Sequence, residues 1–189
     1  MDEAIVVWLN GGVGRVGPFD DVMETVVSDY FAPVLGSLVL LALWFSGDDR
    51  SRFANQVTTA TGTMAVGFAN MLVAILNANI FRDRPFVDHD LTLLFYEPTD
   101  SSFPANATAV GFGLATAVFV RHRRLGLTLY ALAFAWGFAR VYAGVHYPTD
   151  VLTGAAIGIV AAFMAVGLMR LIDPIFRRTV AVFSRVYFT

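Results

Sequence analysis

Long apolar stretches separated by short polar connections run through most of the chain. A bilayer core of about 30 Å requires about 20 helical residues, so this pattern predicts membrane-spanning helices. Five candidate spans are found, at residues 30–45, 53–81, 104–120, 125–142 and 148–171. We therefore expect an all-α fold, a polytopic membrane helical bundle with about five transmembrane helices.

The two ends of the chain differ from the spans because their apolar stretches carry charges. Residues 4–9 and 19–27 are joined by a glycine-rich segment and are predicted to be interfacial amphipathic helices. The tail, residues 175–188, alternates arginine with valine and phenylalanine, and is predicted to be a helix on the membrane surface. We expect one integral-membrane domain over 1–189, with an interfacial segment 1–29, a transmembrane core 30–171 and a cytoplasmic tail 172–189.

Composition supports the membrane prediction. Of the 189 residues, 57% are hydrophobic and 15% are charged, against roughly 25% charged in a typical soluble domain. These values exclude a disordered chain, a nucleic-acid-binding arm and an ordinary soluble domain. The chain has no cysteine, which excludes disulfides and thiol chemistry. The net charge of −2 indicates no nucleic-acid partner.

The basic residues, all 13 of them arginine, are distributed unequally between the two ends of the predicted spans. Nine fall on one side, which the positive-inside rule makes cytoplasmic. The other four are Arg15, Arg82, Arg84 and Arg140. We therefore expect a multi-pass protein of the cell (plasma) membrane, with the loops around residues 82–103 and 143–147 on the extracytoplasmic face.

Two patterns inside the spans predict helix packing. Thr59, Thr63, Asn70 and Asn77 share one face of the second span, and interhelix hydrogen bonds are the simplest role for Thr63 and Asn70. The fifth span contains a GxxxG pattern that begins at Gly154, which predicts close packing against another helix.

The extracytoplasmic ends of three separate segments carry the side chains of a candidate site. Arg84 ends the second span, Arg140 closes the fourth, and His146 and Asp150 open the fifth. Two arginines beside apolar spans suit binding of phosphate oxygens. If the chain is helical there, the spacing of four places Asp150 beside His146, where a carboxylate can orient an imidazole. A neutral histidine held in this way is a plausible nucleophile toward phosphorus.

The start of the third span adds a possible anion site. Ser102 could cap this helix with Pro104 in its first turn, so that free backbone N–H groups face the same side. The same residues also have simpler explanations. An arginine at the membrane border can extend to the headgroups, and His146 with Asp150 could form a salt bridge or, with His89, a metal site.

Together these segments resemble the type 2 phosphatidic acid phosphatase (PAP2) family. Arg140-x5-His146-x3-Asp150 resembles its third motif, Arg84-Pro85 resembles the end of its first, and 101–107 takes the place of its second. The stretch 81–90 is most similar to the BcrC-type branch, which acts on undecaprenyl diphosphate. The resemblance covers roughly residues 30–170.

The resemblance implies roles for the candidate residues. His146 would be the nucleophile that forms a phosphohistidine, Asp150 would orient it, and Arg84 and Arg140 would hold the phosphoryl oxygens. Ser102 and Asn106 would contribute to phosphate binding. The family needs no metal or other cofactor, and its substrates are lipid phosphates or diphosphates in the membrane.

Two positions depart from the family pattern. The first motif begins with a lysine where this chain has Asn77, whose amide can still donate hydrogen bonds. The second motif reads Pro-Ser-Gly-His or a near variant, and its histidine is the general acid. Here it reads Pro104-Ala105-Asn106-Ala107, so that histidine is absent. His89 is a possible auxiliary proton donor.

Loss of the acid favours a diphosphate substrate. A monoester expels an alkoxide, whose conjugate acid has a pKa near that of water, ~15.7, so that step needs a proton. A diphosphate expels a phosphate group with a pKa of about 6, which can leave unprotonated. We therefore predict hydrolysis of a polyprenyl diphosphate to the monophosphate. The alternatives are a catalytically impaired member that binds lipid phosphate, a broader lipid phosphate phosphatase, and a transporter or scaffold with a coincidental motif.

Overall fold

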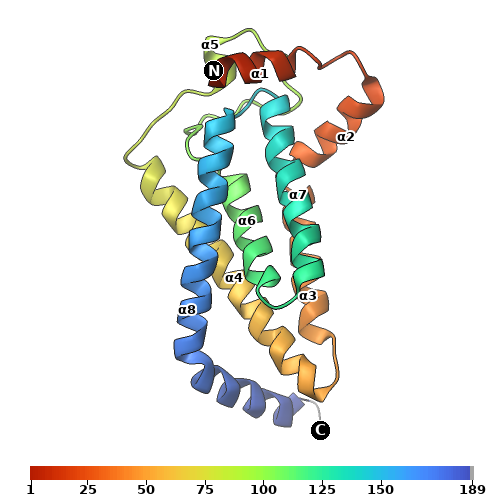
Figure 1. The fold of residues 1–189 in the computed structure, drawn as a ribbon, viewed down its shortest axis with the longest axis vertical. Coiled ribbons are helices and arrows are strands. Elements are labelled where there is room, and N and C mark those ends of the chain that lie inside the picture. Colours follow the sequence, from red (N-terminus) through yellow and green to blue (C-terminus); the bar gives the residue numbers. More distant parts are fainter. Residues whose placement is uncertain (188–189) are drawn as a thin grey trace.

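The computed structural model describes residues 1–187, and within that range all regular secondary structure is helical, with no strands (Figure 1). Its helices, in chain order, are α1 (Asp2–Asn10), α2 (Gly17–Val27), α3 (Phe31–Phe45), α4 (Asp49–Asn77), α5 (Pro85–Asp88), α6 (Asn106–Phe119), α7 (Arg123–Tyr142) and α8 (Pro148–Tyr187). The predicted all-α bundle is therefore confirmed.

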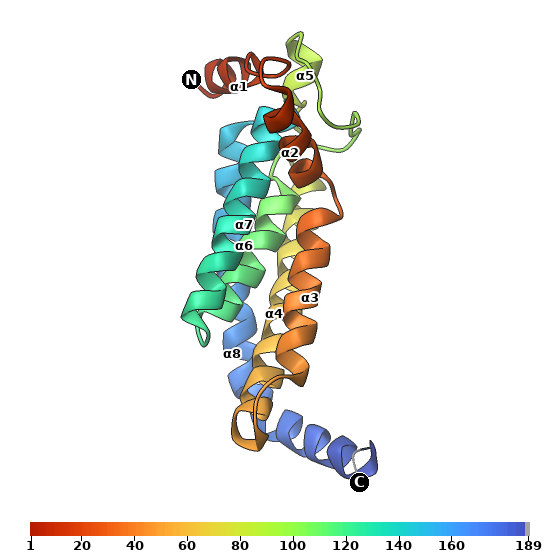
Figure 2. The ribbon, with the colours of Figure 1, turned by 90° about the vertical axis from the view of Figure 1, so that its right-hand side faces the viewer.

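Helix α6 is the centre of the bundle and packs against α4, α7 and α8, while α3 lies along α4 (Figure 2). Most of α6 is buried. The GxxxG pattern explains its closest contact, because a Cβ added at Gly158 would lie 2.2 Å from the Ala109 carbonyl oxygen, and one at Gly154 would lie 2.3 Å from that of Ala105. The predicted close packing is therefore observed, between α8 and α6.

The predicted number of five spans is not supported by helix length. Within the described residues, three helical segments are long and apolar enough to cross a membrane, Ser51–Asn77, Arg123–Tyr142 and Pro148–Val180, and α2 with α3, bent by 59°, could supply a fourth. Helix α6 has 14 residues, about 21 Å at 1.5 Å per residue, and is shorter than a bilayer core. Helix α4 also ends at Asn77, so residues 78–81 lie outside it.

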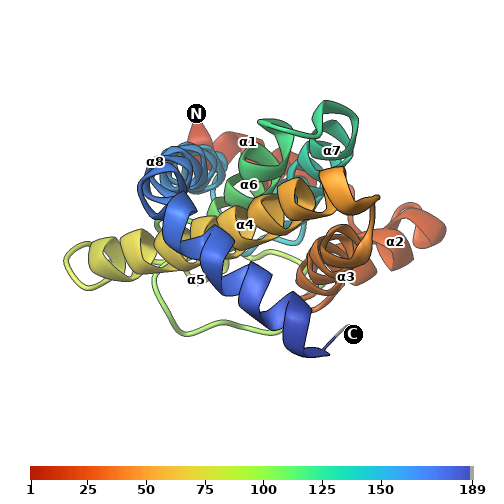
Figure 3. The same ribbon diagram turned by 90° about the horizontal axis from the view of Figure 1, so that it is seen from below.

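The two ends of the chain are helical, as predicted. Helices α1 and α2 lie at the end of the bundle where α4 ends and α8 begins (Figure 1). The tail continues α8, which bends in its last third, where it contains Pro174, and runs across the opposite end of the bundle (Figure 3). A proline inside a helix removes a backbone hydrogen bond and kinks the helix. Phe176 of this tail contacts Phe53 of α4, with ring centroids 6.1 Å apart.

The polar stripe of α4 is only partly used between helices. Thr59 donates to the Leu40 carbonyl oxygen of α3, and Asn70 accepts from Asn106 of α6. Thr63 instead donates to the Thr59 carbonyl oxygen of its own helix. The predicted interhelix bond of Asn70 is therefore present, whereas the prediction for Thr63 is wrong, because the hydroxyl is satisfied one turn back.

Candidate active site

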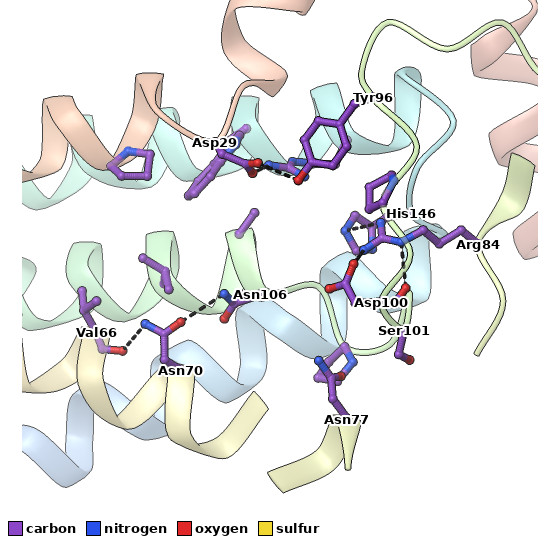
Figure 4. A pocket seen from close by; sticks show the side chains of 17 residues that line it. Asp29, Val66, Asn70, Asn77, Arg84, Tyr96, Asp100, Ser101, Asn106 and His146 are labelled. Atoms are coloured by element: carbon purple, nitrogen blue, oxygen red, sulfur yellow. Dashed lines mark hydrogen bonds and ion pairs between the residues drawn. The ribbon is translucent and has the colours of Figure 1, made fainter. Parts of the chain in front are cut away.

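The candidate site lies at the end of the bundle where α4 and α7 end and where α6 and α8 begin (Figure 1). A cavity of about 420 Å³ opens there (Figure 4). Five residues predicted from sequence line it: Asn77, Arg84, Asn106, Arg140 and His146. Of the other three, Ser102 and Asp150 are fully buried in contact with one another, and His89 lies outside the cavity. Three segments distant in sequence therefore do meet, as predicted.

His146 lies in the turn between α7 and α8 and is 4% exposed. Its Nδ1 is 2.8 Å from the Ser102 carbonyl oxygen, and since a carbonyl can only accept, Nδ1 carries the proton. Its Nε2 lies 3.2 Å from Nη1 of Arg84 and keeps a lone pair. Burial, Arg84 and Arg140 together hold the pKa of His146 well below its ordinary value. The ring is therefore neutral, with Nε2 as its basic atom.

The contacts of Asp150 differ from those expected. His146 precedes the helix, so a spacing of four does not place the two side chains on one face. The Asp150 carboxylate instead accepts from Ser102 Oγ at 2.5 Å, from the Tyr147 N–H at 3.0 Å and from Arg82 at 2.6 Å. Ser102 Oγ lies 3.4 Å from His146 Nδ1. Asp150 therefore reaches the ring through Ser102, and the predicted direct contact is corrected.

Ser102 itself is not a helix cap. The N-cap of α6 is Ala105, three residues later, and its backbone N–H donates to the Asp150 carbonyl oxygen. The predicted capping role of Ser102 is wrong, because its hydroxyl is used by Asp150. The first turn of α6 still faces the cavity, through Asn106 and Ala107.

Arg84 is 5% exposed and held on several sides. Its Nη1 donates to the Val145 carbonyl oxygen at 2.8 Å and points at His146. Its Nη2 donates to Asp100 Oδ1 at 2.8 Å, and its Nε to the Asp100 backbone oxygen at 3.1 Å. This anchoring fixes the guanidinium beside the ring, where a phosphoryl oxygen would meet both groups.

Arg140 is equally buried and forms an ion pair with Asp29, which precedes α3. Its guanidinium also lies over the rings of Phe95 and Trp136, 4.5 and 5.7 Å from their centroids. The other Asp29 oxygen accepts from Tyr96 at 3.0 Å. Since each cavity arginine is paired with an aspartate, a bound phosphate would compete with carboxylates for both.

The amides on the cavity wall come from two helices. Asn106 of α6 donates to Asn70 of α4 at 3.0 Å, and Asn70 donates to the Val66 carbonyl oxygen of its own helix (Figure 4). Asn77 lies at the lower edge of Figure 4, and its buried Oδ1 has no partner among the described residues. An amide with unused capacity at a cavity wall can bind a polar ligand.

The two positions considered for a general acid, 107 and 89, differ in their relation to the cavity. Ala107, which takes the place of the second-motif histidine when the motif is read without a gap, lines the cavity and is 8% exposed. His89 follows α5 and does not line the cavity. The structure therefore does not place the predicted auxiliary proton donor where a substrate in the cavity would meet it.

Several polar residues at this site were missed by sequence reasoning. They are Asp2, Asp29, Arg82, Tyr96, Asp100 and Ser101. Arg82 and Ser101 lie within the stretches 81–90 and 101–107, and Asp100 directly precedes the second, so their positions were a usable signal. Asp2, Asp29 and Tyr96 belong to segments without a motif, and only the folded chain brings them to the site.

Comparison with known sequences agrees with the motifs. The PAP2 superfamily profile matches residues 58–173, more than half of the chain. Undecaprenyl-diphosphatase BcrC of Bacillus subtilis is 29% identical over 166 residues, which cover 88% of this chain and 83% of that protein. A lipid A 1-phosphatase of Rhizobium etli is 35% identical over 101 residues, which cover 49% of this chain and 42% of that protein.

Solved structures show the same fold. The crystal structure of Aquifex aeolicus LpxE superposes with a TM-score of 0.65 at 27% identity, covering 87% of this chain and 93% of that one. A transmembrane PAP2-type phosphatidylglycerolphosphate phosphatase from Bacillus subtilis gives a TM-score of 0.65 at 24% identity, over 90% and 85% of the two chains, and supports the fold alone. The profile match over more than half of the chain, together with the shared fold and the third motif, shows that this chain belongs to the PAP2 superfamily.

Proposed function

We propose that this protein hydrolyses a polyprenyl (undecaprenyl) diphosphate to the monophosphate through a phosphohistidine on His146, at the extracytoplasmic face of the plasma membrane. Its family and its phosphatase-named relatives make it a membrane lipid phosphatase. The diphosphate substrate, the residue roles and the membrane face are the proposal.

The observation that carries the proposal is the protonation state of the His146 ring. A neutral ring with Nδ1–H on the Ser102 carbonyl oxygen presents the lone pair of Nε2 beside Arg84, in a cavity that also holds Arg140. A nucleophile is useful only in its unprotonated form, and the depressed pKa of His146 maintains that form.

The reaction follows in two displacements. Nε2 attacks the terminal phosphorus, the bond from phosphorus to the bridging oxygen breaks, and the lipid monophosphate leaves with the electron pair. The ring, now phosphorylated on Nε2 and protonated on Nδ1, is cationic, and the Ser102 carbonyl oxygen accepts its N–H. Water then attacks phosphorus, the P–N bond breaks, and inorganic phosphate leaves with the water protons, which restores the neutral ring.

The preference for a diphosphate rests on Ala107. A methyl group lines the cavity where the family motif has its acid, and a positioned general acid is typically worth about 10²–10⁴-fold. A phosphate leaving group does not need that proton, whereas an alkoxide does. BcrC, one of the relatives, is named for a diphosphate substrate.

The extracytoplasmic location rests on the arginine distribution. Four arginines lie at the end of the bundle that carries the cavity, and the other nine belong to the opposite end or to the tail. The positive-inside rule then favours an outward-facing site. A catalytically impaired, lipid-phosphate-binding protein is the second candidate, favoured by Asn77 and Ala107 at the two positions where the family has lysine and histidine.

Phosphate release by the purified protein in detergent tests the proposal. We expect release from undecaprenyl diphosphate, little from phosphatidic acid, and none from His146→Ala. Acid-labile ³²P should appear on the wild-type protein after rapid quenching of a reaction with terminally labelled diphosphate. His89→Ala, a histidine outside the cavity, is the matched control and should retain full activity. Equal turnover of both lipids would overturn the diphosphate preference, and no release above His146→Ala would favour the binding protein.

A further inference from the structure

We propose that Arg82 is a positioning residue for His146 and that Asp2 of helix α1 holds Arg82 in place. Arg82 and Asp2 do not line the described cavity, so neither is placed to contact the substrate. The inference concerns how the proposed nucleophile is held, and in that sense it rests on the proposed function.

The link begins at Asp150, a carboxylate with 0% exposure in the first turn of α8. A buried carboxylate requires a compensating charge and hydrogen bonds. Arg82 supplies the charge, because its Nη1 lies 2.6 Å from Asp150 Oδ1. The same Nη1 donates to Thr149 Oγ1 at 2.9 Å, and the guanidinium lies 3.9 Å from the centroid of the Tyr147 ring. Arg82 is therefore fixed on the α8 side of the loop, whereas Arg84 lines the cavity.

Helix α1 completes the arrangement from the other side. Nη2 of Arg82 donates to Asp2 Oδ2 at 2.8 Å. Asp2 also accepts from the backbone N–H and the hydroxyl of Thr149, at 3.1 and 2.5 Å. Burial raises the pKa of Asp2, but the bonds from Thr149 and Arg82 outweigh this effect and hold the pKa below its ordinary value. The Asp2 carboxylate is thus held in place as a negative charge that pairs with Arg82.

The path from Asp150 to the nucleophile runs through Ser102. Asp150 Oδ2 accepts from the Ser102 hydroxyl, and the Ser102 carbonyl oxygen accepts from Nδ1 of His146. One residue therefore carries both contacts, and a displacement of Ser102 moves the acceptor that sets the ring orientation. A shift of about 1 Å at a reacting group can cost about 10²-fold in rate. Loss of Arg82 should act on the chemical step in this way.

Steady-state kinetics with undecaprenyl diphosphate provide the first test. We expect Arg82→Gln to lower kcat about 10- to 100-fold with KM changed less than about threefold. Arg82→Lys should recover part of the loss, and Asp2→Asn should give a smaller fall. If Asp2 acts only through Arg82, the variant that combines Asp2→Asn with Arg82→Gln should have a kcat no lower than that of Arg82→Gln alone. The matched control is Arg15→Gln, an exposed arginine at the same end of the bundle, which should leave both constants unchanged.

The second test does not depend on turnover. The chain has only three histidines, so ¹⁵N-histidine NMR spectra of the protein in detergent are simple, and His146→Gln assigns one signal. We expect the wild type and Arg15→Gln to show the Nδ1–H tautomer of His146, and Arg82→Gln to show a mixture of tautomers. This measurement also applies if the wild type releases no phosphate, which would contradict the proposed function and leave this inference open to its own test.

The results of the two tests either support or overturn the inference. An unchanged kcat and an unchanged His146 signal in Arg82→Gln would overturn the inference. A rise in KM alone would also overturn it, because Arg82 would then bind substrate directly. If Arg82→Gln does not fold, as judged by gel filtration and thermal melting, Arg82→Lys and Asp2→Asn must still show the tautomer change and the fall in kcat for the inference to stand.

Discussion

Asp29 pairs with Arg140 across 111 positions of the sequence, and this contact joins the segment before α3 to the end of α7 on the wall of the cavity. Tyr96 bonds the other oxygen of the same carboxylate. A carboxylate here compensates a buried guanidinium while the cavity is empty, and it competes with any phosphate that enters.

Replacing Asp29 should therefore strengthen substrate binding. Asp29 is 43% exposed, so the pair is screened by solvent and contributes about 0.5–1 kcal/mol, which corresponds to a roughly two- to fivefold lower KM in Asp29→Asn. The kcat should not change, and the thermal midpoint without ligand should fall slightly because Arg140 loses its partner. Glu24→Gln, an exposed acid on α2, is the control. A higher KM in Asp29→Asn would mean that Asp29 assists binding.

Histidine protonation should make the stability of the protein depend on pH. Burial and two arginines depress the pKa of His146, so below about pH 6.5 the unfolded chain binds a proton there that the folded chain does not. Stability should fall as the pH decreases from 7.5 to 5.5, by at most about 1.4 kcal/mol per pH unit from this group. Thermal midpoints should therefore decrease less in His146→Gln than in the wild type. Parallel curves for the two proteins would contradict the buried, neutral histidine.

Restoring an acid at position 107 should widen the substrate range. Ala107 lines the cavity, so in Ala107→His an imidazole at the start of α6 can reach a leaving oxygen. We expect turnover of phosphatidic acid to rise by up to about 10²–10⁴-fold, with a much smaller change for the diphosphate. Ala107→Gln fills similar space without a titrating proton, and it should give no such gain. Equal gains for the two variants would indicate an effect of size alone.

A cation at position 77 should tighten phosphate binding. Asn77 lines the cavity with an amide oxygen that has no partner within the described part of the chain, and a lysine there could form a charge-assisted hydrogen bond to phosphate. Such bonds exceed neutral ones by about 1 kcal/mol, so KM for the diphosphate in Asn77→Lys should fall roughly fivefold at low salt. The gain should shrink as salt is added. Asn77→Gln keeps the amide and should stay near the wild-type value.

The sequence predicted the type of fold well because helix formation and membrane burial are local properties. The apolar stretches predicted the positions of seven of the helices, although α4 ends four residues before its predicted end and α8 continues through the predicted tail to Tyr187. The number of spans was predicted less well, because α6 is shorter than a bilayer core and is surrounded by α4, α7 and α8. Local hydropathy does not distinguish a short central helix from a complete span.

The sequence also identified three residues that line the cavity, because motif spacing and the alternating direction of successive helices bring Arg84, Arg140 and His146 to one end. It did not predict their partners. Ser102 was expected to cap α6, and Asp150 was expected to contact His146 directly, but the hydroxyl of Ser102 lies between them. Both expectations assumed helical backbone up to the motif residues, whereas His146 lies in a turn.

The amino-acid sequence by itself thus determined an all-helical membrane protein of the PAP2 type, with Arg84, Arg140 and His146 at one end of the bundle. Only the tertiary structure decided which carboxylates pair with Arg84 and Arg140. It also decided that Arg82 pairs with both Asp150 and Asp2. The physical reason is the range of the interactions. Helices follow from neighbours a few residues apart, whereas these ion pairs join segments 16 to 111 positions apart, and their geometry depends on the path of loops without periodicity.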